Sequence, residues 1–141
     1  MIDQITVFLE NDKGRLASLC RAMADAGINM HALTLADSSD YGVARIICDN
    51  PEKTLAALSE AGYRANITKV SAIAVDNQPG GLAGLLEVLD QADINIEYGY
   101  CFMSKGDKAV DILKIRNPER AAVVLSEAGY KVLYPEDVYS E

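Results

Sequence analysis

Two glycine-containing loops hold the residues best suited to bind a small anion. Asn11 and Gly14 stand in the first loop, and Asn77 and Gly80 stand in the second. In both loops the Asn ends a run of alternating apolar and polar residues, and a helical pattern starts just after the Gly. A turn of this kind leaves backbone N–H groups at a helix N-terminus, where a carboxylate or phosphate can be held. We therefore expect a ligand at these loops, although a Gly before a helix also fits a plain turn.

Three further polar residues open the strands that follow the first helix of each half. Asn29 and Asn95 each follow an Ile, and both also fit turn residues at a helix-to-strand junction. His31 is the only histidine, and no Cys, Ser or second His stands at the spacing of a catalytic triad or metal site. By itself it fits a strand residue. The sequence therefore predicts no catalytic residue, no metal site and no cofactor.

These residues belong to an internal repeat that spans the chain. Residues 5–65 align with residues 71–132, and the hexapeptide at 58–63 recurs at 125–130. Hydrophobic periodicity predicts strand, helix, strand, strand, helix and strand in each copy. The expected segments are 5–9, 16–26, 28–36, 43–48, 51–61 and 65–69, and then 70–76, 81–92, 94–103, 109–115, 118–128 and 130–134. The predicted fold class is α+β, with two ferredoxin-like βαββαβ units, antiparallel sheets and helices on one face.

The two units are expected at residues 1–69 and 70–141. Residues 65–76 contain no Pro or Gly, so the last strand of the first copy should run straight into the first strand of the second. Each copy, at about 70 residues, is near the size at which an isolated core is marginal. We therefore expect the units to pair about a pseudo-twofold axis.

Composition excludes several classes of protein. Half of the residues are hydrophobic, a quarter are charged and the net charge is −8, so we expect no nucleic-acid partner and no membrane partner. The chain has neither a membrane-length apolar run nor a signal-peptide pattern near Met1, which predicts a cytoplasmic protein. Cys20, Cys48 and Cys101 are isolated and are expected to be reduced core residues.

The segments Asn77-Gln78-Pro79-Gly80 and Ile94-Asn95-Ile96, in a βαββαβ unit, resemble the ACT domain, a small-molecule-sensing module of many amino-acid metabolic enzymes. The first copy keeps Asn11, Gly14 and the Ile-Asn start of the second strand, but has Lys13 where the proline would be. Both copies match, so the whole chain resembles a stand-alone tandem ACT protein.

In that family an effector, usually an amino acid, sits between two ACT units, held by the first loop of one unit and by the Asn that opens the second strand. The resemblance thus implies ligand-binding roles for Asn11, Gly14, Asn29, Asn77, Gly80 and Asn95, with His31 nearby. Loop N–H groups would hold the carboxylate of an amino acid, and Asn and backbone oxygens would accept from its ammonium.

The expected function is that of a non-enzymatic, amino-acid-binding regulatory or sensor protein. We expect it to form a homodimer, and an enzyme of amino-acid metabolism is its implied partner. One alternative is a small ferredoxin-like hydrolase of acylphosphatase type, for which the Lys13-Gly14-Arg15 loop is the support. Another is a structural or assembly protein with degenerate pockets.

Overall fold

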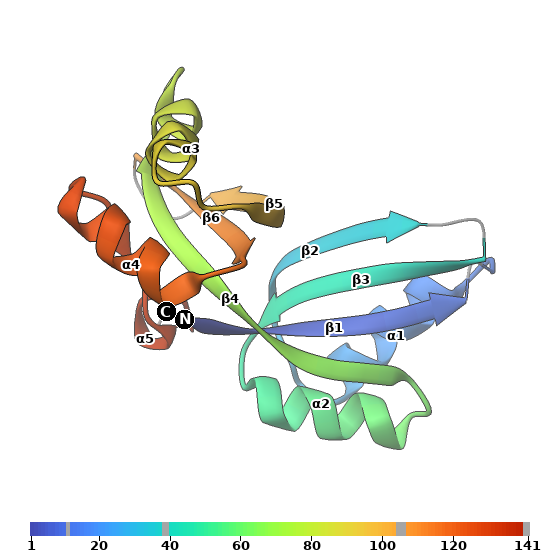
Figure 1. Ribbon diagram of the computed structural model, residues 1–141. Coiled ribbons are helices and arrows are strands. Elements are labelled where there is room, and N and C mark those ends of the chain that lie inside the picture. Colours follow the sequence, from blue (N-terminus) through green and yellow to red (C-terminus); the bar gives the residue numbers. More distant parts are fainter. Residues whose placement is uncertain (11, 38–39, 104–106, 140–141) are drawn as a thin grey trace. The chain divides into compact units, whose positions relative to one another are not determined.

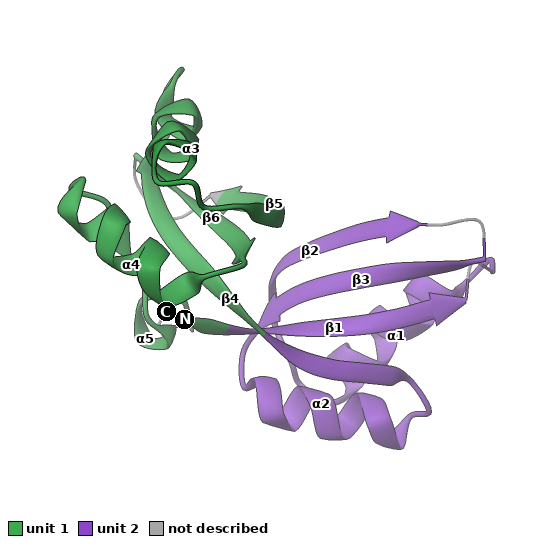
Figure 2. Cartoon of the chain, viewed as in Figure 1, with its two compact units in different colours: residues 1–2, 69–141 green, residues 3–68 purple. Residues whose placement is uncertain are grey.

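The computed structural model describes residues 1–10, 12–37, 40–103 and 107–139 (Figure 1). The chain divides into two compact units (Figure 2). The N-terminal unit comprises residues 3–68, and the C-terminal unit comprises residues 1–2 and 69–141. The strand-helix order βαββαβ occurs twice, with antiparallel sheets and helices on one side, as predicted.

The N-terminal unit is a curled antiparallel sheet backed by two helices. Its elements are β1 (Ile2–Glu10), α1 (Arg15–Asp25), β2 (Met30–Asp37), β3 (Tyr41–Cys48), α2 (Pro51–Glu60) and the first part of β4 (Arg64–Asp76). The strand order is β2-β3-β1-β4. Alternate β1 residues, Ile5, Val7 and Leu9, point to the helix side and pack in a core with Leu19 and Met23 of α1.

The C-terminal unit repeats this plan. Its elements are the rest of β4, α3 (Gly81–Gln91), β5 (Ile96–Met103), β6 (Lys108–Ile115), α4 (Pro118–Glu127), β7 (Lys131–Val132) and α5 (Pro135–Tyr139). Strand β4 lies between β6 and β7, and β5 pairs with the other edge of β6. The core of this unit joins Ile73 and Val75 of β4 to Leu85 and Leu89 of α3.

Local signals explain where the second helix of each copy begins. The side chains of Asn50 and Asn117 accept hydrogen bonds from the backbone N–H groups of Lys53 and Arg120, each at 3.3 Å. A proline follows each Asn at the first helical position, where its missing N–H is not needed. The predicted continuous strand is confirmed, because β4 runs for 13 residues.

Two expectations fail. The short helix α5 was not predicted; Asp137 Oδ2 accepts from the Tyr134 N–H at 2.9 Å and so holds its first turn. Cys48 is buried as expected, but Cys20 is only half-buried and Cys101 is exposed at the sheet edge.

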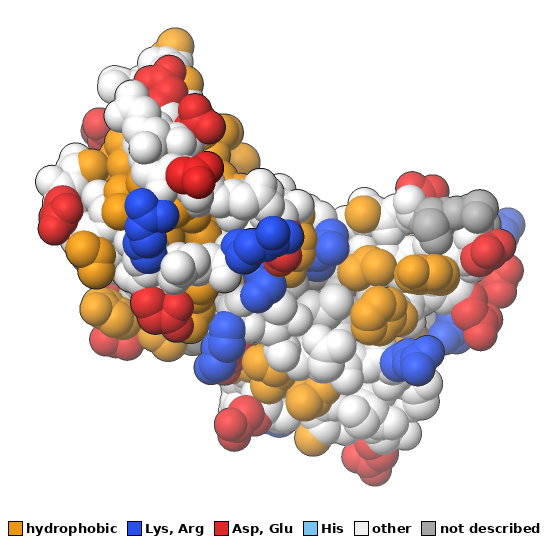
Figure 3. All heavy atoms as spheres, viewed as in Figure 1, with side chains coloured by type: hydrophobic (Ala, Val, Ile, Leu, Met, Phe, Trp, Pro, Cys, Tyr) orange, Lys and Arg blue, Asp and Glu red, His pale blue; other side chains and the backbone are white. Residues whose placement is uncertain are grey.

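On the face shown in Figure 3, acidic side chains lie over both units. None of the helices in the described part of the chain has the length and apolarity needed to cross a membrane.

Candidate functional site

The glycines of the two predicted loops adopt the same backbone conformation. Gly14 and Gly80 each precede a helix with φ of 87°, a left-handed conformation that glycine adopts without strain. Asn77 is exposed, and its N–H donates to the Asp107 carbonyl at 2.8 Å. Asn11 lies outside the described residues. Both copies therefore share the glycine conformation that precedes the helix.

The strand-opening asparagines lie far from these loops within each unit. The Asn95 carbonyl accepts from the Arg116 N–H at 3.2 Å, at the end of the β5–β6 hairpin remote from Asp107. The hairpin strands have eight residues each, which separates its two ends by about 26 Å. The Asn29 carbonyl accepts from Asp49 in the equivalent place. Neither unit brings its predicted loop and its predicted asparagine into one pocket, and their ligand roles remain predictions.

His31 is paired to a carboxylate. Its Nε2 lies 2.6 Å from Asp49 Oδ1, and both side chains are partly exposed. The equivalent residues of the second copy are Glu97 and Arg116, whose Oε1 and Nη2 atoms lie 4.0 Å apart. The acid and the base have thus exchanged places between the copies. Exposed pairs of this kind contribute about 0–1 kcal/mol, so neither marks a binding site by itself.

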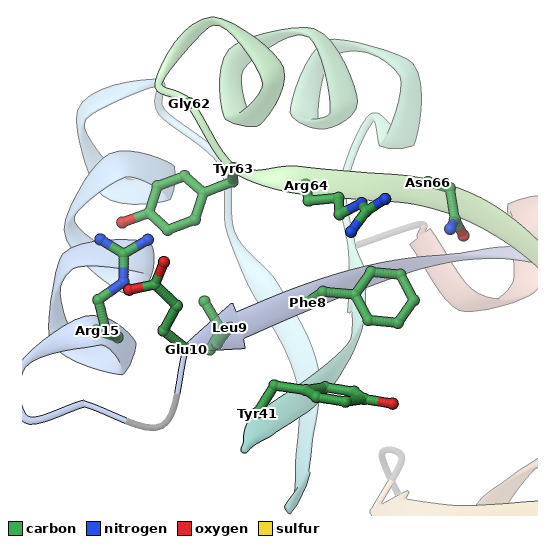
Figure 4. Close-up of a pocket in the computed structure, with 9 residues that line it drawn as sticks. All are labelled: Phe8, Leu9, Glu10, Arg15, Tyr41, Gly62, Tyr63, Arg64 and Asn66. Atoms are coloured by element: carbon green, nitrogen blue, oxygen red, sulfur yellow. The ribbon is translucent and has the colours of Figure 1, made fainter.

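A hollow lined by charged side chains lies in the N-terminal unit, beside the first loop. This Arg15 pocket has a volume of about 740 Å³, within the range of small-molecule sites. It is lined by Phe8, Leu9, Glu10, Arg15, Tyr41, Gly62, Tyr63, Arg64 and Asn66 (Figure 4). These residues come from β1, the start of α1, β3, and the α2–β4 turn with the start of β4, so the fold assembles the pocket from four separate segments.

Arg15, Glu10 and Tyr63 share one end of the Arg15 pocket (Figure 4). The guanidinium carbon of Arg15 lies 5.2 Å from the centre of the Tyr63 ring, a cation–π contact that holds the side chain in place. Arg15 Nε is buried and has no hydrogen-bond partner among the described residues. A buried donor without a partner costs about 1–3 kcal/mol, so this end of the pocket favours a ligand that brings an acceptor.

Aromatic and polar groups form the rest of the Arg15 pocket. The rings of Phe8 and Tyr41 lie 6.4 Å apart with an interplanar angle of 57°. Arg64 and Asn66 project from β4 next to Phe8 (Figure 4). The pocket therefore offers guanidinium donors for a carboxylate, the Glu10 carboxylate for an ammonium group and an aromatic wall for an apolar side chain.

The second copy does not repeat this pocket. The aligned residues are Ala74 for Phe8, Gly81 for Arg15 and Leu133 for Asn66. None of the six predicted ligand residues that the structure describes lines the Arg15 pocket, although Gly14 precedes Arg15 directly. The difference between the two copies at these positions is the sequence signal that could have pointed to the Arg15 pocket. Residues that differ between two copies of one fold are not needed for the fold itself. In the described ranges no cluster of His, Cys, Asp and Glu could hold a metal ion.

Comparison with known proteins gives one family and a set of similar folds. A family described as the ACT domain pair matches residues 1–139. Protein BT0572 from Bacteroides thetaiotaomicron is 34% identical, with a TM-score of 0.92 over 99% of this chain and 96% of that chain. No curated protein is a significant match.

Two structures of aspartate kinases share the fold at lower identity. The ligand-free regulatory subunit of aspartate kinase from Thermus thermophilus is 16% identical, with a TM-score of 0.67 over 90% of each chain. Aspartokinase III of E. coli in complex with lysine and aspartate is 17% identical, with a TM-score of 0.52 over 89% of this chain and 30% of that chain.

Proposed function

The chain belongs to the family of ACT domain pairs, and from this premise we propose that it is a non-enzymatic regulatory protein that binds a free amino acid. The observation that carries the proposal is the Arg15 pocket, where a buried Arg15 Nε without a described partner stands near the Glu10 carboxylate. An amino acid brings a carboxylate that can accept from Arg15 and an ammonium group that can donate to Glu10.

The side of the pocket away from Arg15 favours an amino acid with an apolar or aromatic side chain. Phe8 and Tyr41 expose 38% and 50% of their surface, which a bound side chain would cover. Burial of apolar area stabilises a complex by about 25 cal/mol per Å², so this wall can add affinity as well as selectivity. Aspartokinase III of E. coli, whose fold is similar, was solved with lysine and aspartate bound, which supports an amino acid as the class of ligand.

Regulation follows if the amino acid binds one conformation of the protein better than another. The shift in population can be no larger than the difference in affinity for the two conformations. We propose a homodimer as the binding form and an enzyme of amino-acid metabolism as the regulated partner. The similarity to the regulatory subunit of a bacterial aspartate kinase supports an enzyme of amino-acid metabolism as the partner.

The proposal is tested by thermal-shift measurements on the full chain with each standard amino acid. A ligand that binds only the folded state raises the melting temperature, by an amount that grows with the logarithm of its concentration relative to its dissociation constant. We expect one amino acid, or one related group, to raise it, and we expect Arg15→Gln to weaken that ligand at least about tenfold, since a charge-assisted bond contributes about 1.5–3 kcal/mol.

Arg21→Gln is the matched control, because Arg21 lies on the same helix, is 75% exposed and undergoes the same change of charge. It should bind as the unaltered protein does. The proposal fails if no amino acid raises the melting temperature at millimolar concentration, or if the two arginine variants bind equally well.

A further inference from the structure

One buried carboxyl group in the C-terminal unit has an oxygen without a partner. Asp111 on β6 is only 4% exposed. Its Oδ2 atom is buried, and the described part of the chain offers it no hydrogen bond. An unpaired buried acceptor is unfavourable because it has lost its water without gaining a donor, and burial raises the pKa of Asp111 for the same reason. The fold therefore retains a group that destabilises it as it stands.

Asp111 lines a pocket between α3 and the β5–β6 hairpin. This Asp111 pocket has a volume of about 340 Å³, and its other lining residues are Leu82, Leu86, Ile96, Gly99, Tyr100, Cys101 and Leu113. Among these described residues there is no Lys, Arg or His. Asp111 is thus the one ionisable acid in a mainly apolar hollow that carries no cation.

Gly99 lets the Leu113 side chain lie close against β5 in the wall of the Asp111 pocket. Gly99 pairs with Leu113 across the hairpin, next to the Cys101–Asp111 pair. A Cβ atom at position 99 would lie 2.7 Å from Leu113 Cδ2, so a side chain there would compete for the space along the pocket wall.

The first copy has neither feature. The residue aligned with Gly99 is Leu33, and the residue aligned with Asp111 is Ala44, which is fully buried in the core. The acid and the glycine in the pocket wall therefore occur together, in one copy only. Because the same fold forms with Leu and Ala at these places, neither Gly99 nor Asp111 is required by the fold.

We propose that the Asp111 pocket binds a small apolar amine, with its ammonium group donating to Asp111 and its hydrocarbon part lying against the leucines of α3. The cation supplies the missing hydrogen-bond donor and offsets the cost of a buried negative charge. An amino acid fits less well, because its carboxylate would find no cation in the lining. This site is therefore independent of the Arg15 pocket and does not rest on the function proposed for it.

Three ligands of similar shape and different charge test the proposal: benzylamine, benzyl alcohol and benzoate. Each is titrated into the full chain by isothermal titration calorimetry at neutral pH, and the site is located by amide chemical shifts at Gly99 and Leu86. We expect the amine to bind at least about tenfold more tightly than the alcohol, and benzoate not to bind.

Two variants and one control separate the role of Asp111 in amine binding from general effects of a substitution on the protein. Asp111→Asn should weaken the amine at least about tenfold, and Leu86→Trp should exclude it by filling the pocket while Asp111 stays in place. Glu87→Gln makes the same change of charge on the exposed side of α3 and should leave the affinity unchanged. The proposal is overturned if the alcohol binds as tightly as the amine, if Asp111→Asn leaves the amine affinity unaltered, or if the chemical shifts move outside the Asp111 pocket.

Discussion

At the scale of single residues, Asp111 makes the stability of the C-terminal unit depend on pH. Burial raises its folded-state pKa above the ordinary value of 3.8. As pH rises above that value, the unfolded chain loses the proton before the folded chain does, so the folded state binds more protons. The free energy of unfolding contributed by Asp111 therefore falls with rising pH until the folded-state pKa is passed, and it stays low above it.

Asp111→Asn should remove this penalty. We expect the variant to be more stable than the unaltered protein at pH 7 by roughly 1 kcal/mol, with a difference that vanishes below pH about 4. The measurement is urea unfolding at several pH values, with Glu87→Gln as the control for the loss of one negative charge. If Asp111→Asn is less stable than the unaltered protein at pH 7, the buried Asp111 carboxylate does not destabilise the folded state as we infer.

Residue types alone could predict only part of the Arg15 pocket. The loop glycines and Arg15 were noticed because they stand together in the sequence at the start of a helix. Glu10 and Tyr41 face each other only because β1 and β3 pair in one register. Hydrophobic alternation identifies which residues share a face of a strand, but not which residue of the neighbouring strand lies opposite. The pocket could be recognised only after that register was known.

At the scale of secondary-structure elements, the two Asn caps should differ in their contributions to stability. Asn50 caps α2 with φ of 47°, in the left-handed region, whereas Asn117 caps α4 with φ of −127°. Replacing either by Ala removes one capping bond, which costs about 1 kcal/mol. Asn50→Ala should cost about 1 kcal/mol more, because Ala is strained at positive φ and Asn tolerates it.

Chemical unfolding of the two Ala variants checks this difference, and Asn50→Gly is the control. Glycine has no side-chain strain at positive φ, so Asn50→Gly should be more stable than Asn50→Ala. If Asn50→Ala and Asn117→Ala lower the free energy of unfolding equally, backbone strain at residue 50 plays no part in the effect of Asn50→Ala.

Elements with strong local signals were predictable, and α5 was not. Helices α2 and α4 begin at Asn-Pro and end before Gly62 and Gly129, both at φ of 90°, so sequence defines both ends. Helix α5 has five residues, which is too short for an apolar period to show. A helix of that length depends on contacts such as the Tyr134–Asp137 bond, and these form only in the folded chain.

At the scale of the whole molecule, the net charge of −8 should oppose folding at low salt. Like charges that are spread over both units repel more strongly when the screening length is about 30 Å, near 0.01 M salt, than when it is about 8 Å, near 0.15 M. We expect the melting temperature to rise by a few degrees over this range. Sodium and potassium chloride should act alike, and a melting temperature that stays level or falls would contradict the prediction.

The exchange of acid and base between the copies has a consequence for the way a tandem repeat avoids misfolding. Two copies of similar sequence can trade strands while the chain is still collapsing, which is a common error of repeat proteins. If β2 docked beside β6, His31 would meet Arg116 instead of Asp49. The reciprocal mistake, β5 beside β3, would set Glu97 against Asp49, so that two carboxylates would replace a pair of opposite charges. A hairpin assembled from strands of both copies would therefore lose both native pairs and gain one pair of like charges.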